Sequence, residues 1–252
     1  MKHHLTILTG ASRGMGLAMA RQLCRSDARL LCLSRSTADA LDVVAREQGA
    51  DLVQWPADLA EPAGVAVRVQ AWLAAQDPAQ LASATLINNA GVIGRLGPLD
   101  PAWPDDVATA IRVDLEAPLQ LSAAFLTATR NWVLPKKILN ISSGLGRRAM
   151  AGSALYCAAK AGMDHFTRCV ALDEARQPQG VRIVALAPGV IDTGMQSTLR
   201  AGDPAVFPEH GNFVALQQNG MLSSPEEAAS RVLAYLARPD FGSQPIADVR
   251  DA

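Results

Sequence analysis

The stretch that decides the fold is LTGASRGMGLAMA, residues 8–20, which joins a short apolar run to a predicted helix. Its three glycines, Gly10, Gly14 and Gly16, have the spacing G-x-x-x-G-x-G. Glycine loses more backbone freedom on folding than any other residue, so three of them at one corner need a reason. A backbone that turns tightly, or that approaches a phosphate at a helix N-terminus, is such a reason. An ordinary strand–turn–helix corner is the alternative.

Length and composition favour one large α/β domain, or two small ones. The chain has 252 residues, of which 49% are hydrophobic, enough for a substantial core. Its formal net charge is −1 and it has no basic tail or stripe, so no nucleic-acid partner is expected. No apolar run approaches the roughly 18 residues that span a bilayer, and the N-terminal segment before the glycines is too short for a signal peptide. We therefore expect no membrane partner.

The cysteines predict a reducing, cytoplasmic location. They show neither CxxC nor metal-finger spacing, and each has apolar neighbours typical of a helix or a strand. Buried free thiols are the expected state, and no metal site is predicted. The four cysteines are Cys24, Cys32, Cys157 and Cys169.

Short β-rich runs alternate along the chain with segments of helical pattern. Several runs are apolar on both faces, which is typical of a parallel sheet covered by helices on both sides. The alternation indicates βαβ units with right-handed crossovers, and hence a doubly wound α/β fold in three αβα layers. The predicted strands are 5–8, 29–34, 51–55, 84–88, 136–142, 181–187 and 245–249. The predicted helices lie near 15–26, 37–48, 62–76, 104–131, 153–176 and 225–237.

The chain is interpreted as a single domain, residues 1–252, because no repeat, low-complexity tract or linker interrupts it. The least regular stretch, residues 193–220, follows the sixth predicted strand. It therefore overhangs the carboxyl ends of the strands, where doubly wound sheets bind ligands. It is a candidate lid or substrate loop, and a plain surface excursion is the alternative.

Four further segments accompany the glycine stretch. NNAG (88–91) and NISSG (140–144) each follow a predicted strand, YCAAK (156–160) lies on the next predicted helix, and APGVIDTGM (187–195) follows the sixth strand. In order and spacing these motifs resemble the short-chain dehydrogenase/reductase family over nearly the whole chain. The resemblance implies a seven-stranded parallel Rossmann sheet, a bound NAD or NADP, and oxidoreduction between a carbonyl and an alcohol.

The resemblance also implies which residues bind the cofactor. Residues 89–91 would lie beside the adenosine ribose, and Pro188, Gly189 and Thr193 would position the nicotinamide. Asp58 would bond the adenine amine, although a lone aspartate before a helix is more often a cap. The implied set is Gly10, Ser12, Arg13, Gly14, Met15, Gly16, Ser34, Arg35, Asp58, Leu59, Asn89, Ala90, Gly91, Tyr156, Lys160, Pro188, Gly189, Ile191 and Thr193.

Tyr156 and Lys160 are candidate catalytic residues on chemical grounds. They are four residues apart on a predicted helix, so they share a face. A free tyrosine has a pKa of about 10, too high for efficient proton exchange at neutral pH, and a nearby ammonium lowers it. Tyr156 could then donate a proton to a carbonyl oxygen as hydride arrives at its carbon. A helix-surface pair without a function is the alternative.

The resemblance adds Ser143 to this pair. Ser143 precedes Tyr156 by thirteen residues, the usual gap in the family, and would hold the carbonyl by a hydrogen bond. Its neighbour Ser142 is rejected on that spacing. Lys160 would also bind the ribose of the nicotinamide nucleotide.

Asp114, in IRVDLEAP (111–118), stands where the family usually has an asparagine. In the family, the backbone carbonyl at this position supports a water that links the lysine to solvent. A carboxylate here would raise the pKa of Lys160 and weaken its effect on Tyr156, which predicts an alkaline-shifted rate profile. The alternative is that Asp114 faces elsewhere and the alignment is one turn off.

Charge distinguishes the two dinucleotides. NAD enzymes of this fold usually place an acid at the end of the second strand, where it bonds the ribose 2′-hydroxyl. Here that position is Ser34, followed by Arg35, and Arg13 of the glycine loop can reach the same pocket. Two guanidinium groups suit a dianionic phosphate. We predict NADP(H), with solvated surface arginines as the alternative.

The sequence specifies the substrate less closely than the cofactor. The segments 188–196 and 223–251 resemble the branch that includes sepiapterin reductases and benzil-type diketone reductases. This favours a vicinal diketone or a pteridine side-chain carbonyl. Two C-terminal acids, Asp248 and Asp251, are candidate substrate anchors. Three residues could line an apolar site or pack the loop: Met195, Phe207 and Phe213.

Two other functions stay open, a 3-ketoacyl thioester reductase and a non-catalytic NADPH-binding sensor. A sensor would be expected to lose the tyrosine or the lysine, and this chain keeps both. A homodimer or homotetramer is expected, because family members commonly pair the helices near 104–131 and 153–176. Small residues that permit close helix approach include Ala158, Ala159, Ala161 and Gly162.

Overall fold

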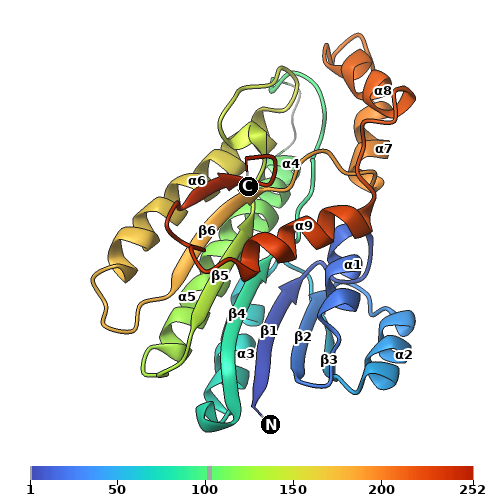
Figure 1. The fold of residues 1–252 in the computed structure, drawn as a ribbon. Coiled ribbons are helices and arrows are strands. Elements are labelled where there is room, and N and C mark those ends of the chain that lie inside the picture. The colour runs from blue at the N-terminus through green and yellow to red at the C-terminus, as the bar shows by residue number, and fades with distance from the viewer. Residues whose placement is uncertain (1, 101–103, 252) are drawn as a thin grey trace.

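A seven-stranded, fully parallel sheet in the order β3-β2-β1-β4-β5-β6-β7 forms the centre of the protein (Figure 1). The computed structural model describes residues 2–100 and 104–251. The strands are β1 (His3–Thr9), β2 (Ala28–Ser34), β3 (Asp51–Pro56), β4 (Leu81–Asn88), β5 (Lys136–Ile141), β6 (Arg182–Ala187) and β7 (Ile246–Asp248). The expected doubly wound, seven-stranded α/β fold is confirmed.

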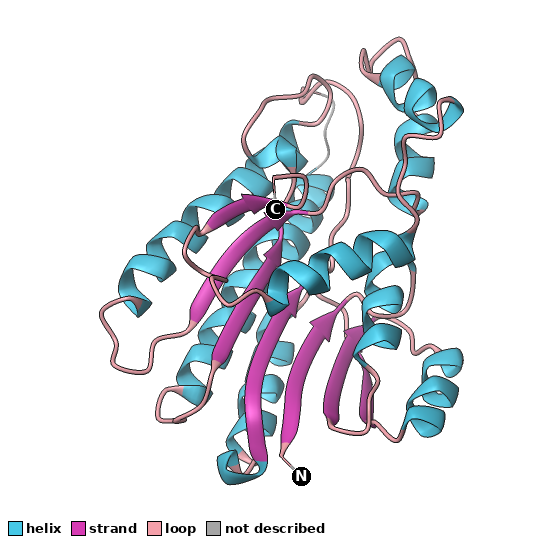
Figure 2. Cartoon of the chain, viewed as in Figure 1, coloured by secondary structure: helices cyan, strands magenta, loops and turns pink. Residues whose placement is uncertain are grey.

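Helices cover both faces of the sheet (Figure 2). They are α1 (Gly14–Leu23), α2 (Asp39–Gln48), α3 (Pro62–Ala74), α4 (Pro104–Ile111), α5 (Ala117–Thr129), α6 (Ala154–Glu174), α7 (Gly194–Arg200), α8 (His210–Gln218) and α9 (Pro225–Ala237). Short 3-10 helices occupy Pro78–Gln80 and Gly144–Gly146.

Two apolar clusters explain this three-layer arrangement. Leu8 of β1 packs with buried side chains of α1, α2 and α9. Leu5 and Ile7 of the same strand pack with buried side chains of α3 and α5, and α6 contributes at the edge. Residues 5 and 7 lie on one face and residue 8 on the other because successive side chains in a strand alternate. The strand is apolar on both faces because both faces are covered.

The order of the strands places a ligand site between β1 and β4. From β1 the sheet is built outward in both directions, to β2 and β3 on one side and to β4 through β7 on the other. The loops after β1 and β4 therefore leave in opposite directions and open a crevice at the carboxyl ends of the strands. The glycine stretch follows β1, and Asn89 and Gly91 follow β4.

Two segments differ from the sequence expectations. The helix expected near 104–131 is interrupted by a π-helical turn, Arg112–Glu116, which separates α4 from α5. The irregular stretch 193–220 contains α7 and α8, which extend away from the sheet beyond its carboxyl edge (Figure 1). A π-turn leaves no periodic mark in the sequence, and helices of seven and nine residues are too short for a clear pattern.

Candidate active site

A cleft of about 1000 Å³ opens at the carboxyl ends of the strands. Every residue that the sequence assigned to the cofactor lines it, and so do Ser143, Tyr156 and Lys160. Asp114 does not line the cleft. It is fully buried, beside the lining residue Lys160. Residues from seven separate segments of the sequence are thus brought to one cavity.

The glycine loop is held closely against the segment after β4. Gly10 has φ +70°, in the left-handed region that favours glycine. A Cβ on Gly16 would lie 2.0 Å from the Gly10 carbonyl oxygen and 2.6 Å from Asn89 Nδ2. Asn89 Nδ2 donates to the Thr9 carbonyl at 2.9 Å, and Thr9 Oγ1 accepts from the backbone N–H of Ala90 at 2.9 Å. The close packing of this loop therefore requires a residue without a side chain at position 16.

The same loop fits a dinucleotide phosphate. With no side chain at Gly14 and Gly16, the N-terminus of α1 faces the cleft with its free N–H groups and the positive end of the helix dipole. Arg13 and Arg35 are exposed at this end of the cleft. Within residues 2–100 and 104–251, neither arginine forms an ion pair. Their charges are available to an anion.

Asp58 lies in the cleft as expected, and it also forms a local turn. Its Oδ1 accepts a hydrogen bond from the backbone N–H of Ala60 at 2.9 Å. The N-cap of α3 is Glu61, so Asp58 is not the cap of that helix. Its carboxylate is exposed and faces the cavity with Leu59.

Ser143, Tyr156 and Lys160 come together where β5 and α6 meet. The Lys160 Nζ lies 5.6 Å from the centroid of the Tyr156 ring and donates to the Ile141 carbonyl at 2.9 Å. Ser143 forms a side-chain hydrogen bond with Tyr156, and its Oγ also accepts from the backbone N–H of Leu145 at 3.1 Å. Tyr156 and Lys160 are both buried on α6. One hydroxyl, one phenol and one ammonium thus share one end of the cleft.

The pKa of Tyr156 is raised, opposite to the direction expected from Lys160 alone. Burial of the phenol is the largest cause, the negative charge of Asp114 adds to it, and the hydrogen bond with Ser143 opposes it. Burial also lowers the pKa of Lys160, while the charges of Asp114 and Asp164 raise it. Burial therefore decides the direction of the net shift, against the direction expected from Lys160 alone. In this environment the phenol keeps its proton.

Asp114 lies close enough to Lys160 for its charge to raise the pKa of the lysine. Asp114 lies in the π-turn, and its Oδ1 accepts from the backbone N–H of Val92 at 2.8 Å. Its Oδ2 has no hydrogen-bond partner within the described residues. Burial raises the pKa of this carboxyl to about 6, although the Lys160 charge and the Val92 hydrogen bond oppose the shift. The carboxylate acts on the pKa of Tyr156 and of Lys160.

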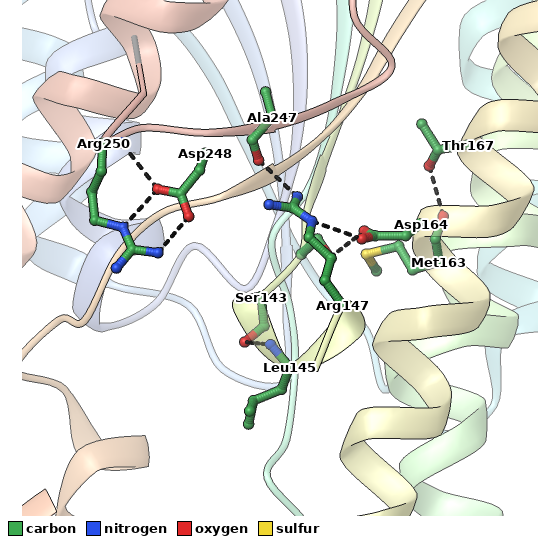
Figure 3. A network of polar contacts seen from close by, with 10 residues as sticks. Ser143, Leu145, Arg147, Met163, Asp164, Thr167, Ala247, Asp248 and Arg250 are labelled. Atoms are coloured by element: carbon green, nitrogen blue, oxygen red, sulfur yellow. Dashed lines mark hydrogen bonds and ion pairs between the residues drawn. The ribbon is translucent and has the colours of Figure 1, made fainter. Parts of the chain in front are cut away.

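Several residues that support the site were not predicted from the sequence. The Asn88 amide donates to Asn140 Oδ1 at 2.8 Å, and the Asn140 amide donates to Thr167 Oγ1 at 2.9 Å, which joins β4, β5 and α6 beneath the cleft. Arg147 and Asp164 form an ion pair beside Ser143 (Figure 3). Asp164 follows Lys160 by one helical turn, and an acid on that buried face is the signal that could have found it.

Part of the lining of the cleft is apolar. It includes Leu145, Met195 and Phe213. Phe207 is fully buried and stacks on Phe213, with 5.8 Å between ring centroids, so it packs the segment rather than lining the cavity. Asp248 is also buried, in a bidentate ion pair with Arg250 at 2.8 and 2.6 Å (Figure 3). Its carboxylate is therefore occupied, which argues against a role as a substrate anchor.

No helix in residues 2–100 and 104–251 has the length and apolar character needed to cross a membrane. The same residues contain no group of three or more His, Cys, Asp or Glu side chains arranged to hold a metal ion.

Comparison with known proteins agrees with the fold. Residues 4–204 match the family model of the short chain dehydrogenases. The benzil reductase of Bacillus cereus, which forms (S)-benzoin, is 33% identical over 235 residues, or 93% of this chain and 94% of that protein. The sepiapterin reductase of Bos taurus is 31% identical, over 95% of this chain and 91% of that protein.

A solved structure from Beutenbergia cavernae, with bound NADP at low occupancy, superposes with a TM-score of 0.79. It is 29% identical and covers 99% of this chain and 96% of that chain. The family model covers most of the sequence, and relatives above 30% identity span nearly all of it. This protein is therefore a member of the short-chain dehydrogenase/reductase family of oxidoreductases.

Proposed function

We propose that the protein is an NADPH-dependent carbonyl reductase in which Tyr156 is the proton donor. The observation that carries this proposal is the meeting of Ser143, Tyr156 and Lys160 at one end of the cleft. The raised pKa keeps Tyr156 protonated at neutral pH, and the Lys160 charge beside it would stabilise the phenolate that forms when the proton leaves.

Each residue of the site has a defined role in this proposal. The Ser143 hydroxyl donates a hydrogen bond to the substrate carbonyl oxygen and orients it. Tyr156 transfers its phenolic proton to the same oxygen, while Lys160 places a positive charge beside the phenolate that remains. When bound, NADPH supplies the hydride to the carbonyl carbon. The apolar residues that line part of the cleft exclude water from the reacting carbonyl.

The proposed substrate is a vicinal diketone or a pteridine side-chain carbonyl. The likeness to benzil and sepiapterin reductases supports this choice, and the apolar lining suits an aromatic body. The test is NADPH oxidation against a panel of aromatic diketones, sepiapterin and 3-ketoacyl thioesters. We expect the highest kcat/KM with a diketone or a pterin. A highest value with a thioester would favour the 3-ketoacyl thioester reductase, and NADPH binding without turnover would favour a sensor.

Arg13 and Arg35 are proposed to select NADPH. We expect wild-type protein to have a lower KM for NADPH than for NADH. Replacing either arginine with alanine should raise the KM for NADPH about tenfold and leave that for NADH unchanged, because one charge-assisted contact to the 2′-phosphate is lost. Arg46→Ala, an exposed arginine on α2 outside the cleft, is the control. Equal Michaelis constants in the wild type would contradict the assignment.

We propose that the charge of Asp114 sets the pH dependence of the reaction rate. Above a pKa of about 6 its carboxylate is ionised and raises the pKa of Tyr156. Alcohol oxidation requires the phenolate, so its rate should rise with pH, and Asp114→Asn should move that rise to lower pH by about one unit. Glu116→Gln, in the same π-turn but bonded to Gln120, is the control and should leave the profile in place. An unchanged profile of rate against pH in Asp114→Asn would contradict this role.

We also propose a cytoplasmic homodimer or homotetramer. The four cysteines are unpaired, which suits a reducing compartment. On α6, Ala158 and Ala161 are exposed and permit close approach of a second helix, whereas Ala159 is buried and Gly162 packs against Leu115. Sedimentation at several protein concentrations tests the oligomeric state.

A further inference from the structure

The turn that carries Ser143 is held on both sides by one buried carboxylate. Asp164 on α6 is only 2% exposed. Its Oδ1 accepts a hydrogen bond from the Ser142 hydroxyl at 2.5 Å, and its Oδ2 accepts from Arg147 Nε at 3.1 Å. Ser142 precedes Ser143 and Arg147 follows it, so the two oxygens of Asp164 hold both ends of the turn.

The same turn lies directly against α6. A Cβ on Gly146 would lie 2.9 Å from the Lys160 carbonyl oxygen and 3.2 Å from Asp164 Oδ2. The Gly146 N–H donates to the Ser143 carbonyl at 3.0 Å, which closes the turn. Because Tyr156 and Lys160 are on α6, the contacts of Asp164 fix where Ser143 stands relative to both of them.

Arg147 extends this arrangement to the last strand. Its Nη2 donates to the Ala247 carbonyl of β7 at 2.8 Å, while its Nε binds Asp164 (Figure 3). The guanidinium therefore joins the C-terminal strand to the Ser143 turn through two groups held in one plane. Its side chain is 30% exposed, so this residue can be changed without opening the core.

We propose that Asp164 is a positioning residue for Ser143, and that Arg147 couples it to β7. The proposal rests on the proposed function, in which Ser143 orients the carbonyl. Without the carboxylate, the buried Ser142 hydroxyl loses its acceptor and the turn is free to move from α6. A displacement of about 1 Å in a reacting group costs on the order of 10²-fold in rate.

The kinetic test compares Arg147→Ala, Asp164→Asn and Asp164→Ala. We expect kcat to fall about tenfold in Arg147→Ala and about 100-fold in Asp164→Ala, with the KM for NADPH unchanged. The kcat of Asp164→Asn should lie between the values of these two variants, because the amide oxygen of the asparagine still accepts a hydrogen bond from Ser142. The kcat of the double variant with Arg147→Ala and Asp164→Ala should be less than about twofold below that of Asp164→Ala alone, because both residues act through one contact. A kcat within twofold of wild type in Arg147→Ala would overturn the proposal.

A second readout does not depend on turnover. The chain has two tyrosines, Tyr156 and Tyr235, so carbon-13 tyrosine labelling gives two Cζ signals, which Tyr235→Phe assigns. Ser143→Ala defines the shift of the Tyr156 signal on loss of its hydrogen bond. Arg147→Ala and the Asp164 variants should move that signal in the same direction. Arg147→Ala also decides the question should Asp164→Ala fail to fold.

Arg238→Ala is the matched control for the labelling experiment. Arg238 pairs with Asp240 at 2.9 Å and stands 5.3 Å from the Tyr235 ring, so only the Tyr235 signal should move. A Tyr156 signal that moves in Ser143→Ala but not in Arg147→Ala would overturn the positioning role. A signal that does not move in Ser143→Ala would also overturn it, since no contact would then need positioning. If wild-type protein reduces no substrate, the proposed function fails, and the labelling experiment still decides the role of Asp164.

Discussion

Tyr156→Phe is expected to lower kcat for carbonyl reduction by about 10³-fold, because it removes the only group placed to donate a proton in the proposed mechanism. The phenylalanine ring keeps the packing of Tyr156 against Ile93, Leu145 and the rest of their apolar cluster. The fold and the cleft should therefore be unchanged. Steady-state kinetics at saturating NADPH measures the effect.

NADPH binding is the control for this variant. Titration of the cofactor fluorescence should give a dissociation constant within about twofold of the wild-type value, because Ser143 and Lys160 remain in place. A kcat within threefold of wild type would assign the proton to another group. A loss of binding equal to the loss of rate would show that Tyr156 acts through its contact with the cofactor rather than as the proton donor.

Gly16→Ala is expected to weaken NADPH binding by about 100-fold or more. The new Cβ would lie 2.0 Å from the Gly10 carbonyl oxygen and 2.6 Å from Asn89 Nδ2, so the backbone of the loop must move. Overpacking of this kind also costs about 1–3 kcal/mol in the free energy of unfolding. Equilibrium binding and urea denaturation measure the two effects separately.

Gly64→Ala is the matched control, because Gly64 lies in α3 and a Cβ there would meet nothing within 4 Å. Its unfolding free energy should rise by about 0.5–1 kcal/mol, since alanine favours a helix more than glycine does. Gly14→Ala is an intermediate case, with φ +54° but only the Thr193 methyl at 3.4 Å. Wild-type affinity in Gly16→Ala would show that the loop tolerates a side chain and does not hold the phosphate by its backbone.

The sheet, the glycine loop and the pair of Tyr156 and Lys160 could be predicted from the sequence because their signals are local. The apolar run before Gly10 predicts a strand, and the glycines after it predict a close approach of backbone. Tyr156 and Lys160 share a helical face by spacing alone. Each of these inferences needs only a few neighbouring residues, and the structure places all of them at the same cleft.

The supporting contacts could not be predicted, because their partners are far apart in the chain. Thr9 accepts from the backbone of Ala90, 81 residues away, and Arg147 reaches Ala247, 100 residues away. The direction of the pKa shift of Tyr156 could not be predicted from the sequence either. It depends on burial and on the nearby Asp114, and both depend on the tertiary packing. The sequence identifies a tyrosine with a lysine, and the fold decides how tightly that tyrosine holds its proton.

The segment with α7 and α8 has a practical consequence for engineering. It contributes Met195 and Phe213 to the cavity, while most residues proposed to bind the nucleotide lie in the loops that follow β1, β2, β3 and β4. Both helices extend beyond the sheet (Figure 1), and their anchor is a small apolar cluster around Phe207. If the proposed function holds, grafting residues 195–220 from a homologue, with Thr193 left in place, should therefore transplant substrate preference while the recipient keeps its own coenzyme affinity.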